Sequence, residues 1–322
     1  MTPNAGSDDP GMDTPGEAFA ILGDETRLRI LRALGEAGEP LQFSELYDRV
    51  EYDDPSNFNY HLKRLAGHFV EDTDAGYALR PEGRRVVKAV LAGFMTETPE
   101  IERTRVETPC FLCGSNEMEV SYRDGIVGVY CSACGGIKDG SRPTMEWADD
   151  STTDIVGKVG LPSAGAKNRP PSEILRVGEL WSCWIAHALA RDACPECSAP
   201  VEHSIHVCED HDDAGGRCGA CGRQSAVTVT SSCTHCIRDQ RFVFSALLLA
   251  NTDVMRFMID HGLDPLVPRA FHHAAVEETV LSADPFEARF TFTADGEALT
   301  LTVDDALNVV EVMRERTVDT DR

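Results

Sequence analysis

The pattern of hydrophobic and polar positions over residues 17–95 predicts three helices, a hairpin and a closing helix. Apolar side chains recur at helical spacing after Asp24, whose carboxylate is suited to cap a helix. Around Gly76 the pattern changes to short alternating runs separated by a turn, as in a β-hairpin. We expect helices over residues 24–34, 41–50, 57–65 and 81–94, and strands over residues 70–73 and 77–80. Residues 1–16 are polar, lack periodicity and are expected to form a disordered tail.

The pattern in the remaining chain predicts several small units instead of one large core. Helices are expected over residues 172–190, 242–261 and 304–316, and strands over residues 117–122, 126–130, 201–207, 226–231, 278–282, 286–293 and 298–303. We therefore expect an α+β multidomain chain. Its parts are the tail (1–16), the helical domain (17–95), a cysteine module (106–140), a linker or irregular segment (141–171), a helix with a second cysteine module (172–238) and a small C-terminal α+β unit (239–322).

Two stretches of the helical domain carry a family resemblance. Three helices, a hairpin and a closing helix form a winged helix–turn–helix domain. Residues 22–34, Leu-Gly-Asp-Glu-Thr-Arg-Leu-Arg-Ile-Leu-Arg-Ala-Leu, and residues 56–65, Ser-Asn-Phe-Asn-Tyr-His-Leu-Lys-Arg-Leu, resemble the opening and the recognition helix of ArsR-like (arsenical-resistance-repressor-like) transcriptional regulators. The resemblance covers residues 17–95 and implies binding to double-stranded DNA. Metal-sensing members carry cysteines in or beside the helix before recognition. Residues 41–50 contain none, so metal sensing is not expected there.

The chemistry of residues 56–65 supports DNA binding independently of the resemblance. Side chains expected to face a DNA groove are Ser56, Asn57, Asn59, Tyr60, Lys63 and Arg64, whereas Phe58, Leu62 and Leu65 pack inward. A second basic cluster, suited to phosphates, comprises Arg80, Arg84, Arg85 and Lys88. No acidic residue lies between Pro55 and Val70, although the chain is acidic overall. The alternative is a winged helix that binds a protein through the same polar residues.

The net charge is -24, from 54 acidic and 30 basic residues, of which only five are lysine. This composition resembles that of halophilic archaeal proteins, in which high salt screens the self-repulsion of an acidic surface. An acidic protein with a basic partner is the alternative. Because salt weakens phosphate contacts steeply, we expect a homodimer on a pseudo-palindromic DNA site. The apolar stripe of the closing helix is either core or a dimer face; it comprises Val86, Val87, Val90, Leu91 and Phe94.

The cysteine pattern indicates metal sites in a cytoplasmic protein. No apolar run approaches the ~20 residues that a membrane span needs, and the N-terminus has no signal-peptide core. Of twelve cysteines, ten form Cys-x-x-Cys pairs, which in the cytoplasm favour metal over disulfides. Cys183 has no such partner and is expected to be a buried free thiol.

Twelve candidate ligands form three predicted sites. Two cysteine pairs around the turn at Asp124-Gly125 predict a zinc ribbon; they are Cys110, Cys113, Cys131 and Cys134. Between residues 194 and 236, four further ligand pairs follow along the chain. Paired from the outside inward, they fit one antiparallel register with a single-residue slip, as a β-bulge causes, which predicts a long hairpin with a site at each end. The base site comprises Cys194, Cys197, Cys233 and Cys236, and the tip site comprises Cys208, His211, Cys218 and Cys221.

Two alternatives accompany this assignment. A cross-brace, as in RING or FYVE domains, would join the 194/197 pair to the 218/221 pair and the 208/211 pair to the 233/236 pair. The histidine ligand has neighbours that compete with His211, namely His203, His206 and His235. The spacings do not separate zinc from iron, but sulfur-rich four-coordinate sites usually hold zinc. We expect two or three structural zinc ions.

Acidic residues around the hairpin tip would repel DNA and suit a protein partner; they are Glu209, Asp210, Asp212 and Asp213. The sequence contains no Gly-rich phosphate loop, no nucleophile elbow and no metal cluster with an open position, so an enzyme is not expected. The predicted function is a sequence-specific DNA-binding regulator. The alternative is a zinc-ribbon adaptor that recruits the transcription machinery without reading DNA itself.

Overall fold

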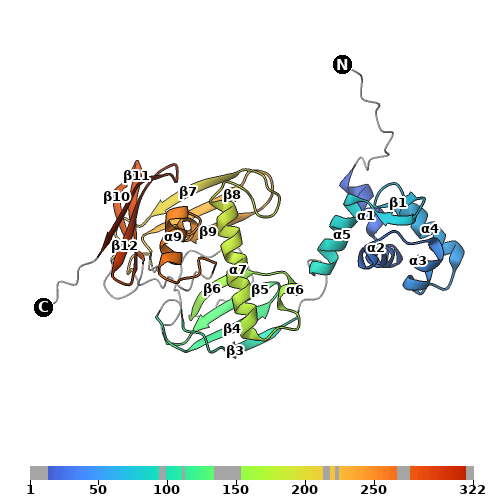
Figure 1. The fold of residues 1–322 in the computed structure, drawn as a ribbon, viewed down its shortest axis with the longest axis horizontal. Coiled ribbons are helices and arrows are strands. Elements are labelled where there is room, and N and C mark those ends of the chain that lie inside the picture. Colours follow the sequence, from blue (N-terminus) through green and yellow to red (C-terminus); the bar gives the residue numbers. More distant parts are fainter. Residues whose placement is uncertain are drawn as a thin grey trace, which may run out of the picture. The chain divides into compact units, whose positions relative to one another are not determined.

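The computed structural model describes residues 14–93, 99–110, 113–133, 154–212, 218–221, 225–266 and 276–316. The chain divides into two compact units, residues 1–97 and residues 98–322, and each is described by itself (Figure 1). Helices and several small antiparallel sheets make up both units, as the α+β prediction requires.

The first unit has the predicted elements in the predicted order, preceded by one unpredicted helix, α1. It comprises α1 (Pro15–Leu22), α2 (Glu25–Ala37), α3 (Phe43–Val50), α4 (Pro55–Leu65), β1 (Val70–Thr73), β2 (Gly76–Leu79) and α5 (Pro81–Ala92). The Asp24 carboxylate accepts a hydrogen bond from the amide of Arg27 at 3.2 Å, and Gly38 ends α2 in the left-handed conformation. The predicted tail is too long, because α1 begins at Pro15. Residues 1–13 lie outside the described part of the chain.

Apolar side chains from the helices and the hairpin pack together in the core of the first unit. Phe58, Leu62 and Leu65 of α4 are buried there, as the sequence predicts. On α5, Val87 belongs to the core whereas Leu91 is 48% exposed, so only part of the apolar stripe is core. Phe94, the last member of that stripe, lies outside the described residues.

The second unit begins with a four-stranded sheet. Its strands are β3 (Ile101–Arg105), β4 (Met118–Arg123), β5 (Ile126–Cys131) and β6 (Ile155–Gly160), in this order. The prediction of an irregular linker over residues 141–171 is wrong at β6 and at α6 (Ser163–Ala166). Glycine and lysine interrupt the apolar residues of β6, and hydrogen-bonded pairing with β5 defines this strand more than its own pattern does.

Helix α7 (Pro171–Leu189) runs across this unit (Figure 1). It joins two clusters of apolar side chains. Ile174 and Leu175 pack with β4, β5 and β6, where Gly178 lets the helix approach Val127. At the other end, Ile185 and Leu189 belong to a second cluster. One long amphipathic helix therefore links the first sheet to the rest of the unit.

The second cluster lies between two more sheets. One contains β7 (Val201–Val207), β8 (Val227–Cys233) and β9 (Asp239–Val243), and is followed by α8 (Phe244–Leu248) and α9 (Thr252–Asp260). The predicted single helix over residues 242–261 is wrong. Asn251 caps α9 by accepting hydrogen bonds from the amides of Asp253 and Val254, which starts a new helix at this point.

The last sheet has four consecutive strands, β10 (Val276–Ala283), β11 (Phe286–Ala294), β12 (Glu297–Asp304) and β13 (Val309–Arg316). A final helix over residues 304–316 is wrong. The Asp304 carboxylate accepts from the amides of Ala306 and Asn308, so it stabilises the turn into β13. The rings of Phe244 and Phe290 stack at 4.8 Å, which places this sheet in the same core as α8.

Candidate metal centres and a basic helix face

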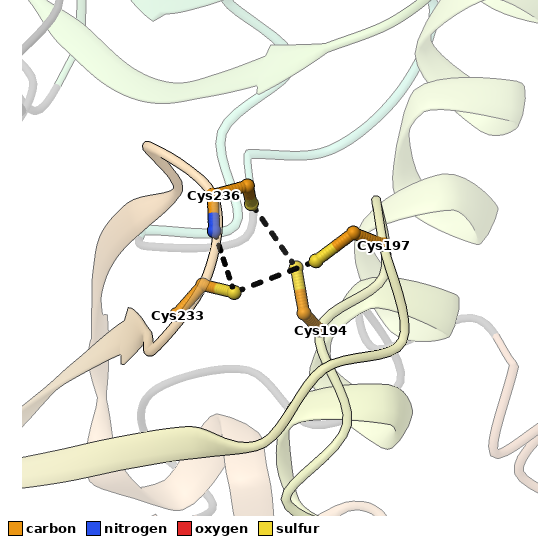
Figure 2. Close-up of side chains that lie close together, drawn as sticks. All are labelled: Cys194, Cys197, Cys233 and Cys236. Carbon is orange, nitrogen blue, oxygen red and sulfur yellow. Dashed lines mark hydrogen bonds between the residues drawn. The ribbon is translucent and has the colours of Figure 1, made fainter. Parts of the chain in front are cut away.

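The base site lies where two loops converge. Cys194 and Cys197 occupy a tight turn after α7, Cys233 is the last residue of β8, and Cys236 follows that strand (Figure 2). The sulfurs of Cys194 and Cys236 are 3.6 Å apart, and those of Cys197 and Cys233 are 3.5 Å apart. All four sulfurs lie within 4.8 Å of one another. Four converging sulfurs form a donor set for one tetrahedral ion.

Backbone amides prepare one of these thiols for metal binding. The amides of Cys236 and His235 donate to the sulfur of Cys233 at 3.3 and 3.4 Å. These hydrogen bonds lower the pKa of the Cys233 thiol to about 6. Because metals bind the thiolate, these amides favour the ligating form of Cys233, whereas the pKa of Cys236 in the same site is raised to about 12.

The tip site unites the four residues that the nested hairpin predicts. The sulfurs of Cys208 and Cys218 are 3.9 Å apart, and Nδ1 of His211 lies 3.5 Å from the sulfur of Cys221. The Cys221 amide donates to the Cys218 sulfur at 3.4 Å and lowers the pKa of that thiol to about 6. These four ligand atoms also lie within 4.8 Å of one another, so they could hold one ion.

The competing histidines are engaged elsewhere. His203 contacts the Ser231 hydroxyl at 2.9 Å and the Asp192 carboxylate at 3.2 Å, and His206 contacts the Thr230 hydroxyl at 3.1 Å. His235 contributes its amide to the base site. The histidine at the tip site is therefore His211.

The two sites have the nested arrangement, and the cross-brace pairing does not occur. The register expected for the hairpin is nevertheless wrong. Val201 pairs with Cys233 and Val207 pairs with Val227, without a register shift between them. The pairs at 194/197 and 208/211 lie outside β7, and their turns bring the sulfurs together independently of the strand register.

The third group of ligands lies beside the first sheet. Cys110, Cys113 and Cys131 place their sulfurs within 4.8 Å of one another, and the Cys113 and Cys131 sulfurs are 3.7 Å apart. Backbone hydrogen bonds support the first pair, with the Cys110 amide donating to the Ser115 carbonyl at 2.7 Å and the Gly114 amide donating to the Cys110 carbonyl at 2.8 Å. Cys134, the fourth predicted ligand, lies outside the described residues.

The predicted DNA contacts lie together on the outer face of α4. Ser56, Asn57, Tyr60, Lys63 and Arg64 are exposed, and Asn59 is half-buried. Asp54 caps the helix, accepting from the amides of Ser56 and Asn57 at 2.8 and 3.2 Å. The Asn57 side chain donates to the Tyr52 hydroxyl at 2.7 Å, so Tyr52 orients a residue of this face.

The second basic cluster is partly occupied by internal partners. Arg84, Arg85 and Lys88 are exposed and Arg80 is half-buried. Glu82 lies 4.0 Å from Arg80 and 3.7 Å from Arg85, and the Arg84 side chain donates to the Leu79 carbonyl. Lys63, Arg64 and Lys88 are exposed and form no ion pair within the described part of the chain. Sequence reasoning also missed His61, which is buried with Nδ1 3.4 Å from the Asp24 carboxylate.

A family model described as domain of unknown function (DUF7351) matches residues 107–309. The chain belongs to this DUF7351 family. A second model, domain of unknown function (DUF7347), matches residues 15–90. No curated protein and no solved structure matches the chain.

In this DUF7351 protein all three ligand groups lie within the matched residues 107–309, whereas the basic face of α4 lies within residues 15–90. The two family matches thus follow the division into two compact units. Among the described residues, no helix has the length and apolar character that crossing a membrane requires.

Proposed function

We propose that this chain is a sequence-specific DNA-binding transcriptional regulator without catalytic activity. Its first unit acts as a winged helix–turn–helix domain of the ArsR-like kind, with α4 as recognition helix and β1–β2 as wing. The observation that carries the proposal is the two-sided character of α4. Its apolar side chains are buried at 0–1% exposure, while Asn57, Lys63 and Arg64 are exposed on a stretch without acidic residues.

The charge of the chain makes this face distinctive. A protein with net charge -24 repels a polyanion unless a local surface reverses the sign. Residues 56–69 carry Lys63 and Arg64 and no carboxylate, and Arg84, Arg85 and Lys88 supply further exposed cations for phosphates.

The regulator acts as a homodimer on a pseudo-palindromic double-stranded site. A shallow apolar groove between α2 and α5 is lined by Leu28, Val86, Val90 and Leu91, among others. A second copy of the chain could cover the exposed part of Leu91 through a two-fold symmetric contact. The dimer would then present two recognition helices to the two halves of the DNA site. Such pairing supplies affinity that phosphate contacts lose in high salt.

The metal centres are proposed to hold structural zinc. Each of the base and tip sites offers four sulfur or imidazole donors, which close a tetrahedral shell and leave no position for a substrate. The third group forms a zinc ribbon with Cys134 as its fourth ligand. These sites stabilise small sheets in an intracellular, cytoplasmic setting.

Genome-wide DNA occupancy in the organism's own cells tests the regulatory function. The tagged wild-type chain is compared with Lys63→Ala/Arg64→Ala and with Arg289→Ala, which removes an exposed cation from β11 of the other unit. Discrete wild-type peaks that share a motif, persist in Arg289→Ala and vanish in the double variant are the expected result. Absence of a shared motif in the wild type contradicts sequence-specific recognition.

An adaptor of the transcription machinery is the second candidate. Leu180 and Trp184 of α7 are 45% and 47% exposed, and the acidic residues near the tip site suit a protein partner. For this function, chromatin peaks persist in Lys63→Ala/Arg64→Ala, because other proteins recruit the chain.

A further inference from the structure

A carboxylate from the last sheet lies against the loop beside the tip site. Glu278 belongs to β10, and its Oε2 accepts a hydrogen bond from the Val227 amide at 3.1 Å. Ser225 and the Ala226 amide also favour the charged form of this carboxylate and lower its pKa. The Ala226 carbonyl in turn accepts from the amide of Cys208 at 2.9 Å. Glu278 is therefore connected to a tip-site ligand through two successive hydrogen bonds.

The second oxygen of the same carboxylate has an unused acceptor position. Oε1 of Glu278 is shielded from solvent and has no hydrogen-bond partner within the described ranges of the chain. A buried carboxylate oxygen without a donor is costly, so such an atom usually marks a missing partner. Burial raises the pKa of Glu278, while the hydrogen bonds from residues 225–227 and the charge of His211 lower it.

His211 is the nearby ligand that such an oxygen suits. Its Nδ1 faces the sulfur of Cys221 at 3.5 Å, so Nδ1 is the nitrogen positioned to bind an ion. A histidine that binds metal through one nitrogen carries a proton on the other, and that N–H is usually held by a carboxylate or carbonyl. The charge of His211 lowers the pKa of Glu278, so the carboxylate lies within electrostatic range of this ligand, and the hydrogen bonds through the peptide between Ala226 and Val227 connect it to Cys208 of the same site.

We propose that Glu278 is the positioning residue of the tip site, with Oε1 accepting from Nε2–H of His211 when Nδ1 binds the metal. The carboxylate fixes the imidazole tautomer and holds residues 225–227 against the site. Metal binding at the hairpin tip is thereby coupled to β10, a strand of a different sheet. This inference rests on the proposal that the tip site holds a metal.

The first test measures ion release from each site of the full-length zinc-loaded protein. Glu278→Gln is compared with the wild type and with Glu277→Gln, an exposed neighbour on β10. A chelator is added with an alkylating agent, and mass spectrometry follows Cys208, Cys218 and Cys221 for the tip site and Cys194 and Cys197 for the base site. We expect a 10–100-fold loss of tip-site affinity in Glu278→Gln. The base site and the Glu277→Gln variant should match the wild type.

The second test separates action through His211 from support of the loop. In a His211→Cys background the site has no imidazole N–H, and a fourth thiolate lies near the carboxylate. Adding Glu278→Gln there should leave ion release unchanged or slow it, since one negative charge is removed beside the thiolates. An equal loss of affinity in both backgrounds overturns the proposal, because Glu278 then acts through residues 225–227 alone.

Two further outcomes identify which proposal fails. If the wild-type tip cysteines are alkylated at once without chelator while the base site is protected, the tip site holds no metal, and both proposals fail there. If the wild-type tip site holds zinc and Glu278→Gln releases it at the wild-type rate, only the role of Glu278 is overturned.

Discussion

Gly76 is the residue on which the first hairpin depends most directly. Its φ is +119°, and a Cβ built there would lie 2.4 Å from the Leu41 carbonyl oxygen. The neighbouring Tyr77 exchanges backbone hydrogen bonds with Leu41. The two backbones therefore cannot move apart without losing these bonds. We expect Gly76→Ala to lower the unfolding free energy of the first unit by about 2–4 kcal/mol, from backbone strain and overpacking together. Hydrogen exchange of the α2–α5 peptides in the full chain measures the loss.

Gly38→Ala is the matched control. Gly38 also has a positive φ, +71°, but a Cβ there meets nothing within 4 Å. Only the left-handed strain remains, at about 1–2 kcal/mol. Equal effects of the two substitutions would show that the close approach to Leu41 contributes nothing.

Cys183 is the one cysteine for which the sequence predicts a buried free thiol, and the structure confirms its burial. Burial, assisted by the charges of Glu179 and Asp264, raises the pKa of Cys183 to about 12. At pH 8 its thiolate fraction is then on the order of 10⁻⁴, against about a quarter for an ordinary thiol. In the zinc-loaded protein we expect alkylation of Cys183 at pH 8 to be at least about 10²-fold slower than that of an ordinary thiol. Its rate should rise with pH throughout the range in which the protein stays folded.

The control places a thiol one position away on the same helix. Ser182 is half-exposed, so Cys183→Ala/Ser182→Cys offers an ordinary cysteine in the same fold. Rates are read by mass spectrometry of the α7 peptide. Similar rates for the two positions at pH 8 would contradict the shielding of Cys183.

At the scale of elements, α4 depends on a single cap. Asp54 accepts from two amides of the first turn, and Pro55 needs no donor at the first helical position. We expect Asp54→Ala to reduce the stability of the first unit by about 1 kcal/mol, and Asp54→Asn by only a few tenths, because asparagine caps nearly as well. Local hydrogen exchange of α4 gives both values. If asparagine costs as much as alanine, the charge of Asp54 matters more than its hydrogen bonds.

Local chemistry explains which elements the sequence predicts. In the first unit, Asp24, Gly38 and Pro81 lie at helix ends, where their conformational preferences coincide with the fold. β13 is not predicted, because Asp304 and the residues after it follow the pattern of a capped helix. They form a strand through pairing with β12. Pairing with another strand cannot be recognised from the residues of the strand alone.

The candidate sites divide in the same way. Cys-x-x-Cys spacing is a local property of a turn, so the ligand groups are predictable although the register between β7 and β8 is not. Glu278 could not be predicted, since nothing near it in the sequence indicates a neighbour on another sheet. The pairing of Glu82 with Arg80 and Arg85 is different, because Glu82 lies three positions before Arg85 on α5, a spacing that the sequence itself contains.

At the scale of the whole molecule, metal chemistry and the basic helix face belong to different units. Residues 1–97 contain no cysteine, and the core of the first unit consists of apolar side chains from its own helices and hairpin. In the second unit, Cys110 and Cys131 belong to one apolar cluster and Cys194 belongs to the other. The ligands are therefore part of the packing of the second unit and not of the first.

This separation predicts how the protein responds to metal removal. Structural zinc contributes about 10–16 kcal/mol in small zinc-binding peptides, comparable to the whole stability of a domain. Chelation should therefore remove hydrogen-exchange protection from β4, β5, β7 and β8 while α2, α4 and β2 keep theirs. Exchange measured by mass spectrometry on the full chain, with and without chelator, checks this. Unchanged protection throughout would contradict structural metal. Equal loss in both units would show that the first unit depends on the second for its stability, although its apolar core, from Ile21 to Val87, contains none of the ligand groups found among the described residues.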